Sequence, residues 1–88
     1  MQASNISFHP SAIETEIYDI LNSDPEYAAS SDGYTQEAIA AIIKYLNNLR
    51  CQWSFITEDY PNGMGGIISI SWLENGFVHH IMVKYYYV

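Results

Sequence analysis

Apolar and polar side chains alternate within residues 67–88, in two runs on either side of Asn75-Gly76. This pattern predicts a β-hairpin, because alternation is typical of strands and Asn-Gly tolerates the positive φ angles of a two-residue type I′ turn. Such a turn sets these pairs across the hairpin: Glu74 with Phe77, Leu73 with Val78, Trp72 with His79, Ile70 with Ile81 and Ile68 with Val83.

The predicted register sorts the hairpin into two unlike faces, since side chains alternate along each strand. One face is almost entirely apolar and supplies the expected core: Ile68, Ile70, Trp72, Ile81 and Val83. The other face is mixed and pairs Ser71 with His80, Ser69 with Met82 and Ile67 with Lys84. A shift of one residue would mix the two sets, so the turn and the pattern support the same register.

Residues 12–22 are predicted to form a helix whose start is specified by Ser11. The sequence from Ser11 to Glu14 fits a capping box, in which the serine caps the first turn and the glutamate reaches back to it. An apolar stripe follows at helical spacing: Ile13, Ile17, Ile20 and Leu21. Pro25 disfavours helical geometry at the residue before it, and Pro25–Ala29 could form a separate short turn.

A second helix is predicted from Thr35, as its N-cap, to about Leu49. Apolar residues recur along it at helical spacing and define a strongly amphipathic face: Ala38, Ile39, Ile42, Ile43, Leu46 and Leu49. Lys44 and Arg50 lie late in this segment, where positive charge is favourable to the helix dipole.

Residues 51–58 also alternate and predict a first strand, which gives the element order ααβββ. Helices that precede an antiparallel meander usually pack on one face of it. We therefore expect an α+β fold, a two-layer sandwich with both helices on one face of a three-stranded antiparallel sheet. Three strands leave two edges, and the pattern does not decide whether the first strand pairs with the second.

The chain of 88 residues is expected to form a single domain, with residues 1–10 as an N-terminal arm, 11–50 as a helical half and 51–88 as the sheet. Its apolar runs are shorter than a membrane span requires, and its first residues do not resemble a secretory signal. Cys51 is the single cysteine, which excludes an internal disulfide. These features favour a cytoplasmic location.

The net charge of −7 is carried by the first half of the chain. No lysine or arginine precedes Lys44, whereas these acids do: Glu14, Glu16, Asp19, Asp24, Glu26, Asp32 and Glu37. The 3 basic residues of the chain are balanced by acids in the second half. Direct binding to nucleic acid or to an anionic membrane needs clustered lysine and arginine, so neither is expected.

The sequence contains no pattern that indicates catalysis, a cofactor or a metal site. His79 and His80 are adjacent in a strand and point to opposite faces, so they are not expected to share one metal ion. Nothing in the sequence places a histidine beside Cys51 to activate it. The glycine-rich segment 62–66 lacks the Lys-Ser/Thr of a phosphate loop and precedes a strand rather than a helix. We therefore expect a protein that is not an enzyme.

The acidic half, in which tyrosines are interspersed, is the main functional candidate. Tyrosine is enriched at protein interfaces, and acids interleaved with tyrosines suit a surface that imitates a nucleic-acid backbone or blocks a basic active site. We expect an inhibitor or regulator of a basic, nucleic-acid-handling protein, of the anti-restriction, anti-CRISPR, immunity or antitoxin type. The expected partner-binding residues are Glu14, Glu16, Tyr18, Asp19, Asp24, Glu26, Tyr27, Asp32 and Tyr34. A merely solubilising acidic face remains the alternative interpretation.

A homodimeric assembly or small-ligand-binding module is the second functional hypothesis. The predicted second face of the sheet is only half polar, and the last strand is rich in tyrosine. An exposed apolar face of this kind is typical of a contact with another chain. In this hypothesis Met82 and Tyr86 lie in the dimer contact.

Overall fold

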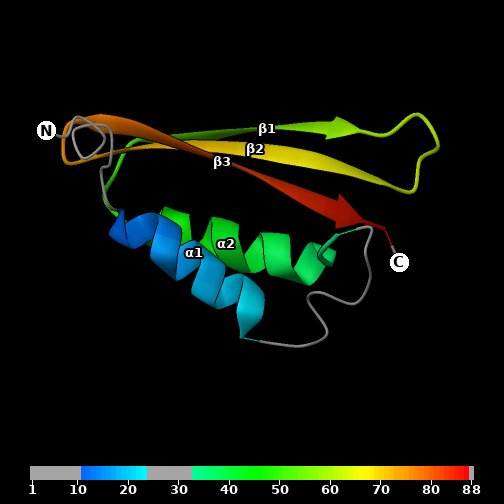
Figure 1. Ribbon diagram of the computed structural model, residues 1–88, viewed down its shortest axis with the longest axis horizontal. Helices are drawn as coiled ribbons and strands as arrows, with labels where there is room; N and C mark the ends of the chain where they lie inside the picture. The colour runs from blue at the N-terminus through cyan, green and yellow to red at the C-terminus, as the bar shows by residue number, and fades with distance from the viewer. Residues whose placement is uncertain (1–10, 24–32, 88) are drawn as a thin grey trace, which may run out of the picture.

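The computed structural model describes residues 11–23 and 33–87 and has two helices followed by three strands. The strands form an antiparallel sheet in the order β1-β2-β3, and both helices lie on one face of it (Figure 1). The elements are α1 (Ala12–Asn22), α2 (Gln36–Asn48), β1 (Trp53–Asp59), β2 (Gly65–Glu74) and β3 (Phe77–Tyr86). The α+β prediction is confirmed, and β1 pairs with β2. The predicted arm, 1–10, and the predicted turn Pro25–Ala29 lie outside the described residues.

The hairpin of β2 and β3 forms in the predicted register around Asn75 and Gly76. Both turn residues have positive φ angles, 55° and 83°, as a type I′ turn requires. The pairs predicted from Glu74–Phe77 to Ile67–Lys84 are all present. Every residue predicted for the core of the hairpin is buried.

Both helices begin at their predicted caps. Ser11 Oγ accepts a hydrogen bond from the Glu14 N–H at 2.9 Å, and Thr35 Oγ1 accepts one from the Ala38 N–H at 3.4 Å. These caps satisfy amide groups that the first helical turn leaves unpaired. The reciprocal bond predicted for the Glu14 side chain is not among the hydrogen bonds of the described residues. Within the same ranges, neither helix has the length and apolar character needed to cross a membrane.

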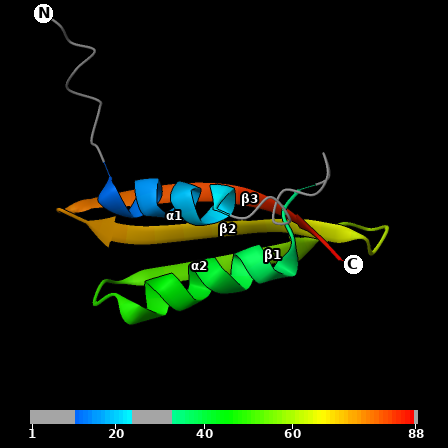
Figure 2. The same cartoon turned by 90° about the horizontal axis from the view of Figure 1, so that it is seen from below.

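The core lies between the helices and the sheet, and α1 lies toward β3 whereas α2 lies toward β1 (Figure 2). The helices contribute Ile17, Leu21, Ala38, Ile42 and Leu46, and the sheet contributes Ile68, Ile70, Trp72, Ile81, Val83 and Tyr85. No residue of β1 is fully buried; only Trp53 packs partly against the core. The sheet is therefore well covered along β2 and β3 and poorly covered along β1.

The segment before α2 pairs with the outer edge of β3. The Tyr34 N–H donates to the Lys84 carbonyl at 2.9 Å, and the Tyr86 N–H donates to the Tyr34 carbonyl at 3.1 Å. Gly33 has a φ angle of 132°, and a Cβ on it would lie 2.7 Å from the Lys84 carbonyl carbon. Only glycine suits this position, both for its backbone angle and for its close approach to β3.

Two local predictions around the first strand are wrong. The strand begins at Trp53 rather than at residue 51, and Cys51 is half-buried in the bend before it. Gly65 and Gly66 belong to the glycine-rich segment 62–66, which was predicted to precede the strand, but they are paired residues of β2. Glycine stands at position 66 of this strand because the strands pack closely there: a Cβ on Gly66 would lie 2.6 Å from the Tyr85 hydroxyl oxygen.

Candidate functional site

The outer side of α1 carries the described part of the predicted acidic region. Glu16, Tyr18 and Asp19 are exposed there, and Glu14 is half-buried. These side chains lie off the apolar stripe that packs into the core. We call these four residues the acidic surface. Other residues of the predicted set lie outside the described residues: Asp24, Glu26, Tyr27 and Asp32.

Tyr34 lies apart from the acidic surface. Its backbone is hydrogen-bonded to β3, and its half-buried side chain packs against the core. The observed role of Tyr34 is therefore to connect the start of α2 to the sheet.

Glu74 anchors the start of α1, and with it the acidic surface, to the hairpin. Its Oε1 accepts hydrogen bonds from Ser11 Oγ at 2.6 Å and from Trp72 Nε1 at 3.0 Å. Its Oε2 accepts one from the Ala12 N–H at 3.0 Å. Sequence reasoning missed this contact, although the predicted register already placed Glu74 and Trp72 on the same face of the hairpin.

The carboxyl group of Glu74 has a lowered pKa. Burial by itself raises the pKa, but hydrogen bonds from the Ser11 and Trp72 side chains and from the backbone of Ala12 and Ile13 outweigh that effect. The ionised carboxylate also lies at the positive end of the α1 dipole, where negative charge is favourable. This junction is therefore a structural contact, already satisfied by groups of the chain itself.

Asp59, at the end of β1, accepts hydrogen bonds from two tyrosines. The hydroxyl groups of Tyr85 and Tyr87 donate to Asp59 Oδ1 at 2.7 Å and 2.8 Å. The two rings meet edge to face, with centroids 5.8 Å apart. Tyr85 reaches Asp59 across Gly66, which lies between them in the sheet. The pairing of Asp59 with Gly66, and of Gly66 with Tyr85, is therefore the feature of the strand register from which this cluster could have been predicted.

These hydrogen bonds shift the pKa values of all three side chains. The bond from Tyr85, with that from Tyr87, lowers the pKa of Asp59. The bond to Asp59 is the largest cause of the raised pKa of Tyr85 and of Tyr87. The Asp59 carboxylate therefore stays ionised, and the two tyrosine hydroxyl groups stay protonated, over a wide pH range.

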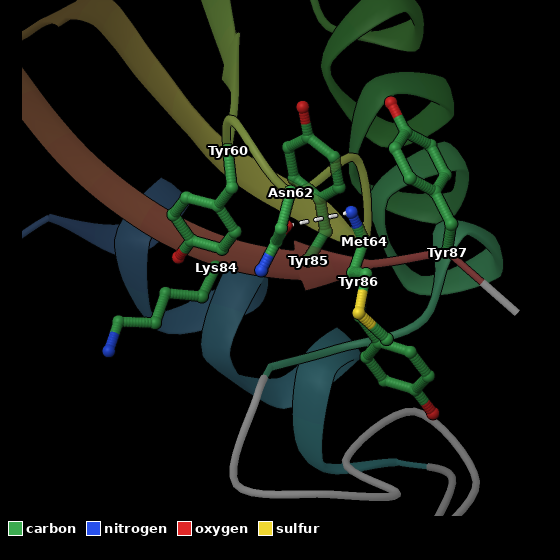
Figure 3. A pocket seen from close by; sticks show the side chains of 7 residues that line it. All are labelled: Tyr60, Asn62, Met64, Lys84, Tyr85, Tyr86 and Tyr87. Carbon is green, nitrogen blue, oxygen red and sulfur yellow. Dashed lines mark hydrogen bonds between the residues drawn. The ribbon is translucent and has the colours of Figure 1, made fainter.

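A pocket of about 260 Å³ lies beside this cluster (Figure 3). Its lining side chains come from the β1–β2 connection and from the end of β3: Tyr60, Asn62, Met64, Lys84, Tyr85, Tyr86 and Tyr87. Asn62 Oδ1 accepts a hydrogen bond from the Met64 N–H at 2.9 Å, which holds one wall in place. The pocket combines aromatic rings with hydroxyl and amide groups, a lining that suits binding.

A second hollow, which we call the α2–β1 groove, runs between α2 and the edge strand. It has a volume of about 320 Å³ and is mainly apolar where Ile39 and Ile43 of α2 face Thr57 of β1. Asp59, Tyr85 and Tyr87 line it as well. The groove exists because α2 does not fully cover β1.

The two adjacent histidines lie on opposite faces of the sheet, as predicted. His79 stacks on Trp72 on the helix-facing side, with ring centroids 5.7 Å apart and planes at 13°. His80 is exposed on the other face, where it pairs with Ser71. In the described part of the chain, no group of three His, Cys, Asp or Glu side chains is arranged to hold a metal ion.

The sheet face away from the helices, which we call the open face, carries several exposed apolar side chains. Ile56 is 74% exposed, Val78 75% and Met82 60%. Tyr86 lies on the same face and is half-buried. Both residues of the hypothetical dimer contact, Met82 and Tyr86, therefore belong to this face.

Comparison of the chain with family models, with curated proteins and with solved structures gives no match.

Proposed function

We propose that this protein is a non-enzymatic binding protein of the cytoplasm that inhibits or regulates a basic, nucleic-acid-handling protein. The observation that supports the proposal is the acidic surface of α1. Glu16, Tyr18 and Asp19 are exposed together on a helix, and no lysine or arginine precedes Lys44 in the chain. A surface that is only solubilising usually mixes the two signs of charge.

The mode of binding follows from this charge distribution. Carboxylates on one helix attract a basic surface over several ångströms, so association is accelerated at low salt and slowed as salt screens the charges. Tyr18, 45% exposed on the same helix, adds apolar area and a hydroxyl group to the contact. The Glu74 junction holds the helix in a fixed orientation, which limits the entropy lost on binding.

The experiment compares two double charge reversals that alter net charge equally. Glu16→Lys with Asp19→Lys changes the acidic surface, whereas Glu37→Lys with Glu58→Lys changes exposed acids elsewhere. A partner is first identified by pull-down from the native host with low-salt and high-salt washes. Its affinity for each variant is then measured by calorimetry.

We expect the first variant to bind at least tenfold more weakly and the second to bind nearly as well as wild type. A salt dependence of the wild-type affinity should accompany this result. Equal losses in both variants would indicate an effect of net charge alone. Unchanged binding by the first variant would refute the role of the acidic surface.

A second candidate function, an assembly or small-ligand-binding module, is favoured by the open face. Its apolar residues Ile56, Val78 and Met82 are more than half exposed, and exposed apolar patches often mark contacts with other molecules. Sedimentation of Met82→Asp and Tyr86→Asp variants tests it. Dissociation of a wild-type dimer by both substitutions would support the open-face contact, and an unchanged dimer would refute it.

A further inference from the structure

The outer edge of β1 presents a row of backbone groups that no described residue pairs with. The Gln52 carbonyl accepts from the Leu73 N–H at 2.9 Å, and the Tyr60 N–H donates to the Gly65 carbonyl at 2.8 Å. Even-numbered residues of this strand therefore bond to β2. Because bonding alternates along an antiparallel strand, the odd-numbered residues direct their N–H and C=O groups outward: Trp53, Phe55, Thr57 and Asp59.

The two edges of the sheet differ in how they are protected. Tyr34 occupies part of the β3 edge through its two hydrogen bonds with Lys84 and Tyr86. Native edge strands are usually blocked by charges, proline or bulges. The central residues of β1, from Phe55 to Thr57, contain none of these, and their two large apolar side chains are 45% and 74% exposed.

We propose that β1 pairs with β1 of a second copy of this chain, antiparallel about a two-fold axis at Ile56. The two sheets then join into one sheet of six strands, with both helical layers on the same side. This register sets the following pairs between the copies: Ile56 with Ile56, Phe55 with Thr57, Ser54 with Glu58 and Trp53 with Asp59. All outward N–H and C=O groups of β1 are used in these pairs.

The register keeps the carboxylates of the two copies apart. Glu58 faces Ser54 of the second copy and Asp59 faces Trp53, so no carboxylate faces another. A register shifted to place the axis at Thr57 would set Ile56 against Glu58 and Phe55 against Asp59. That arrangement would set both carboxylates of each copy against large apolar side chains, which is unfavourable, whereas the proposed register does so only for Asp59 at the end of the strand.

The α2–β1 groove supplies a place for the side chain of Phe55. Phe55 faces the helix side, since it pairs with the core residue Ile70, and its ring stacks on Trp53 with centroids 5.8 Å apart. In the proposed register it lies opposite Thr57 of the second copy, and Thr57 lines the groove together with Ile39 and Ile43. Each Phe55 thus enters the groove of the other copy.

Cysteine cross-linking tests both the edge and the register, in a Cys51→Ser background. Ile56→Cys places two cysteines opposite each other in a non-hydrogen-bonded pair, with Cα atoms about 4.5 Å apart, a spacing that a disulfide accommodates. Ser54→Cys is the matched control on the same strand and face. Its two copies lie about four residues apart along the strands, roughly 13 Å, which is too far.

Under mild oxidation we expect the Ile56→Cys protein to run as a covalent dimer on a non-reducing gel and the Ser54→Cys protein to run as a monomer, because its two cysteines are too far apart to form a disulfide. Equal cross-linking of the two, or none in either, would overturn the proposal.

A backbone substitution gives an independent test. Thr57→Pro removes an outward N–H, whereas the ladder to β2 uses the neighbouring residues and stays intact. Circular dichroism checks the fold, and analytical ultracentrifugation measures the dimer. We expect the dissociation constant of the dimer to rise at least tenfold in Thr57→Pro and to stay unchanged in Met82→Asp. The opposite result would assign the dimer to the open face, and a monomeric wild type at about millimolar concentration would exclude self-pairing. If Thr57→Pro does not fold, the comparison of the Ile56→Cys and Ser54→Cys proteins decides whether β1 forms the contact.

Discussion

At the scale of single residues, two carboxylates organise the contacts between elements that are distant in sequence. Glu74 joins the hairpin to the start of α1 through Ser11 and Ala12. Asp59 joins the end of β1 to Tyr85 and Tyr87. Hydrogen bonds to an ionised group are stronger than those between neutral groups. These two acids therefore have structural roles, unlike the exposed acids of α1.

Replacing Glu74 with glutamine should lower the free energy of unfolding by about 1–2 kcal/mol near neutral pH, because charged hydrogen bonds become neutral ones. The pKa of Glu74 is lower in the folded chain than its ordinary value of 4.5. Its contribution is therefore complete above pH 4.5 and is lost as pH falls through the folded value. Urea unfolding of both proteins at several pH values checks this. A difference between them that does not shrink in acid would contradict it.

The Asp59 cluster is tested by titration of the tyrosines. Asp59→Asn removes the carboxylate whose hydrogen bonds, and to a lesser extent its charge, raise the pKa of Tyr85 and Tyr87, so these phenols should ionise at lower pH than in wild type. Phenolate absorbance during alkaline titration measures the shift. Glu58→Gln, a change at the neighbouring carboxyl, is the control and should leave the curve unchanged. Overlapping curves for Asp59→Asn and wild type would disprove the assignment.

At the scale of elements, close packing between strands decides where glycine is required. A Cβ on Gly66 would meet the Tyr85 hydroxyl and the backbone of Glu58 and Asp59. A Cβ on Gly63, in the β1–β2 turn, would meet nothing within 4 Å, although the φ angle of Gly63 is 73°. A side chain at position 66 is therefore opposed by steric crowding, whereas a side chain at position 63 is opposed only by the backbone angle.

Gly66→Ala should lower the free energy of unfolding by about 2–3 kcal/mol or more, the size of an overpacking effect. Gly63→Ala should cost about 1 kcal/mol, because only its backbone angle is unfavourable for alanine. Chemical denaturation of both variants gives the comparison. A greater loss in Gly63→Ala would show that the contacts around Gly66 relax easily.

The elements could be predicted where a local signal specifies them. Asn75-Gly76 determines both the turn and the register, and Ser11 and Thr35 determine where the helices begin. The pairing of β1 could not be predicted, because its alternation fits either an edge or a central position. The Glu74 and Asp59 contacts were missed for a related reason: each depends on how helices and strands are placed in space, which propensity and periodicity do not encode. The assignment of the acidic surface to binding stays a prediction.

At the scale of the whole molecule, the acidic surface and the β1 edge lie on different sides. α1 lies toward β3, whereas β1 is the opposite edge of the sheet (Figures 1 and 2). A dimer formed through β1 would therefore present two separate acidic surfaces. Binding of a basic partner and pairing of two copies do not compete for the same residues.

This geometry predicts a complex with two partner molecules for each dimer. Light scattering of the complex measures its stoichiometry. Thr57→Pro should give a complex of one copy with one partner and an affinity per site within about threefold of wild type, whereas Glu16→Lys with Asp19→Lys should leave the dimer intact. Loss of partner binding on monomer formation would show that the acidic surface alone is insufficient.

The contact between Tyr34 and β3 has a consequence for the order of events during synthesis. The helices precede the strands in the chain, yet Ile17 and Ile42 are buried against residues that the ribosome adds only later. At about 5–20 residues per second, several seconds separate the appearance of Tyr34 from that of Tyr85. During that time two amphipathic helices have no sheet to pack on, and their apolar stripes are open to chaperones. Productive folding of this chain therefore waits for β3.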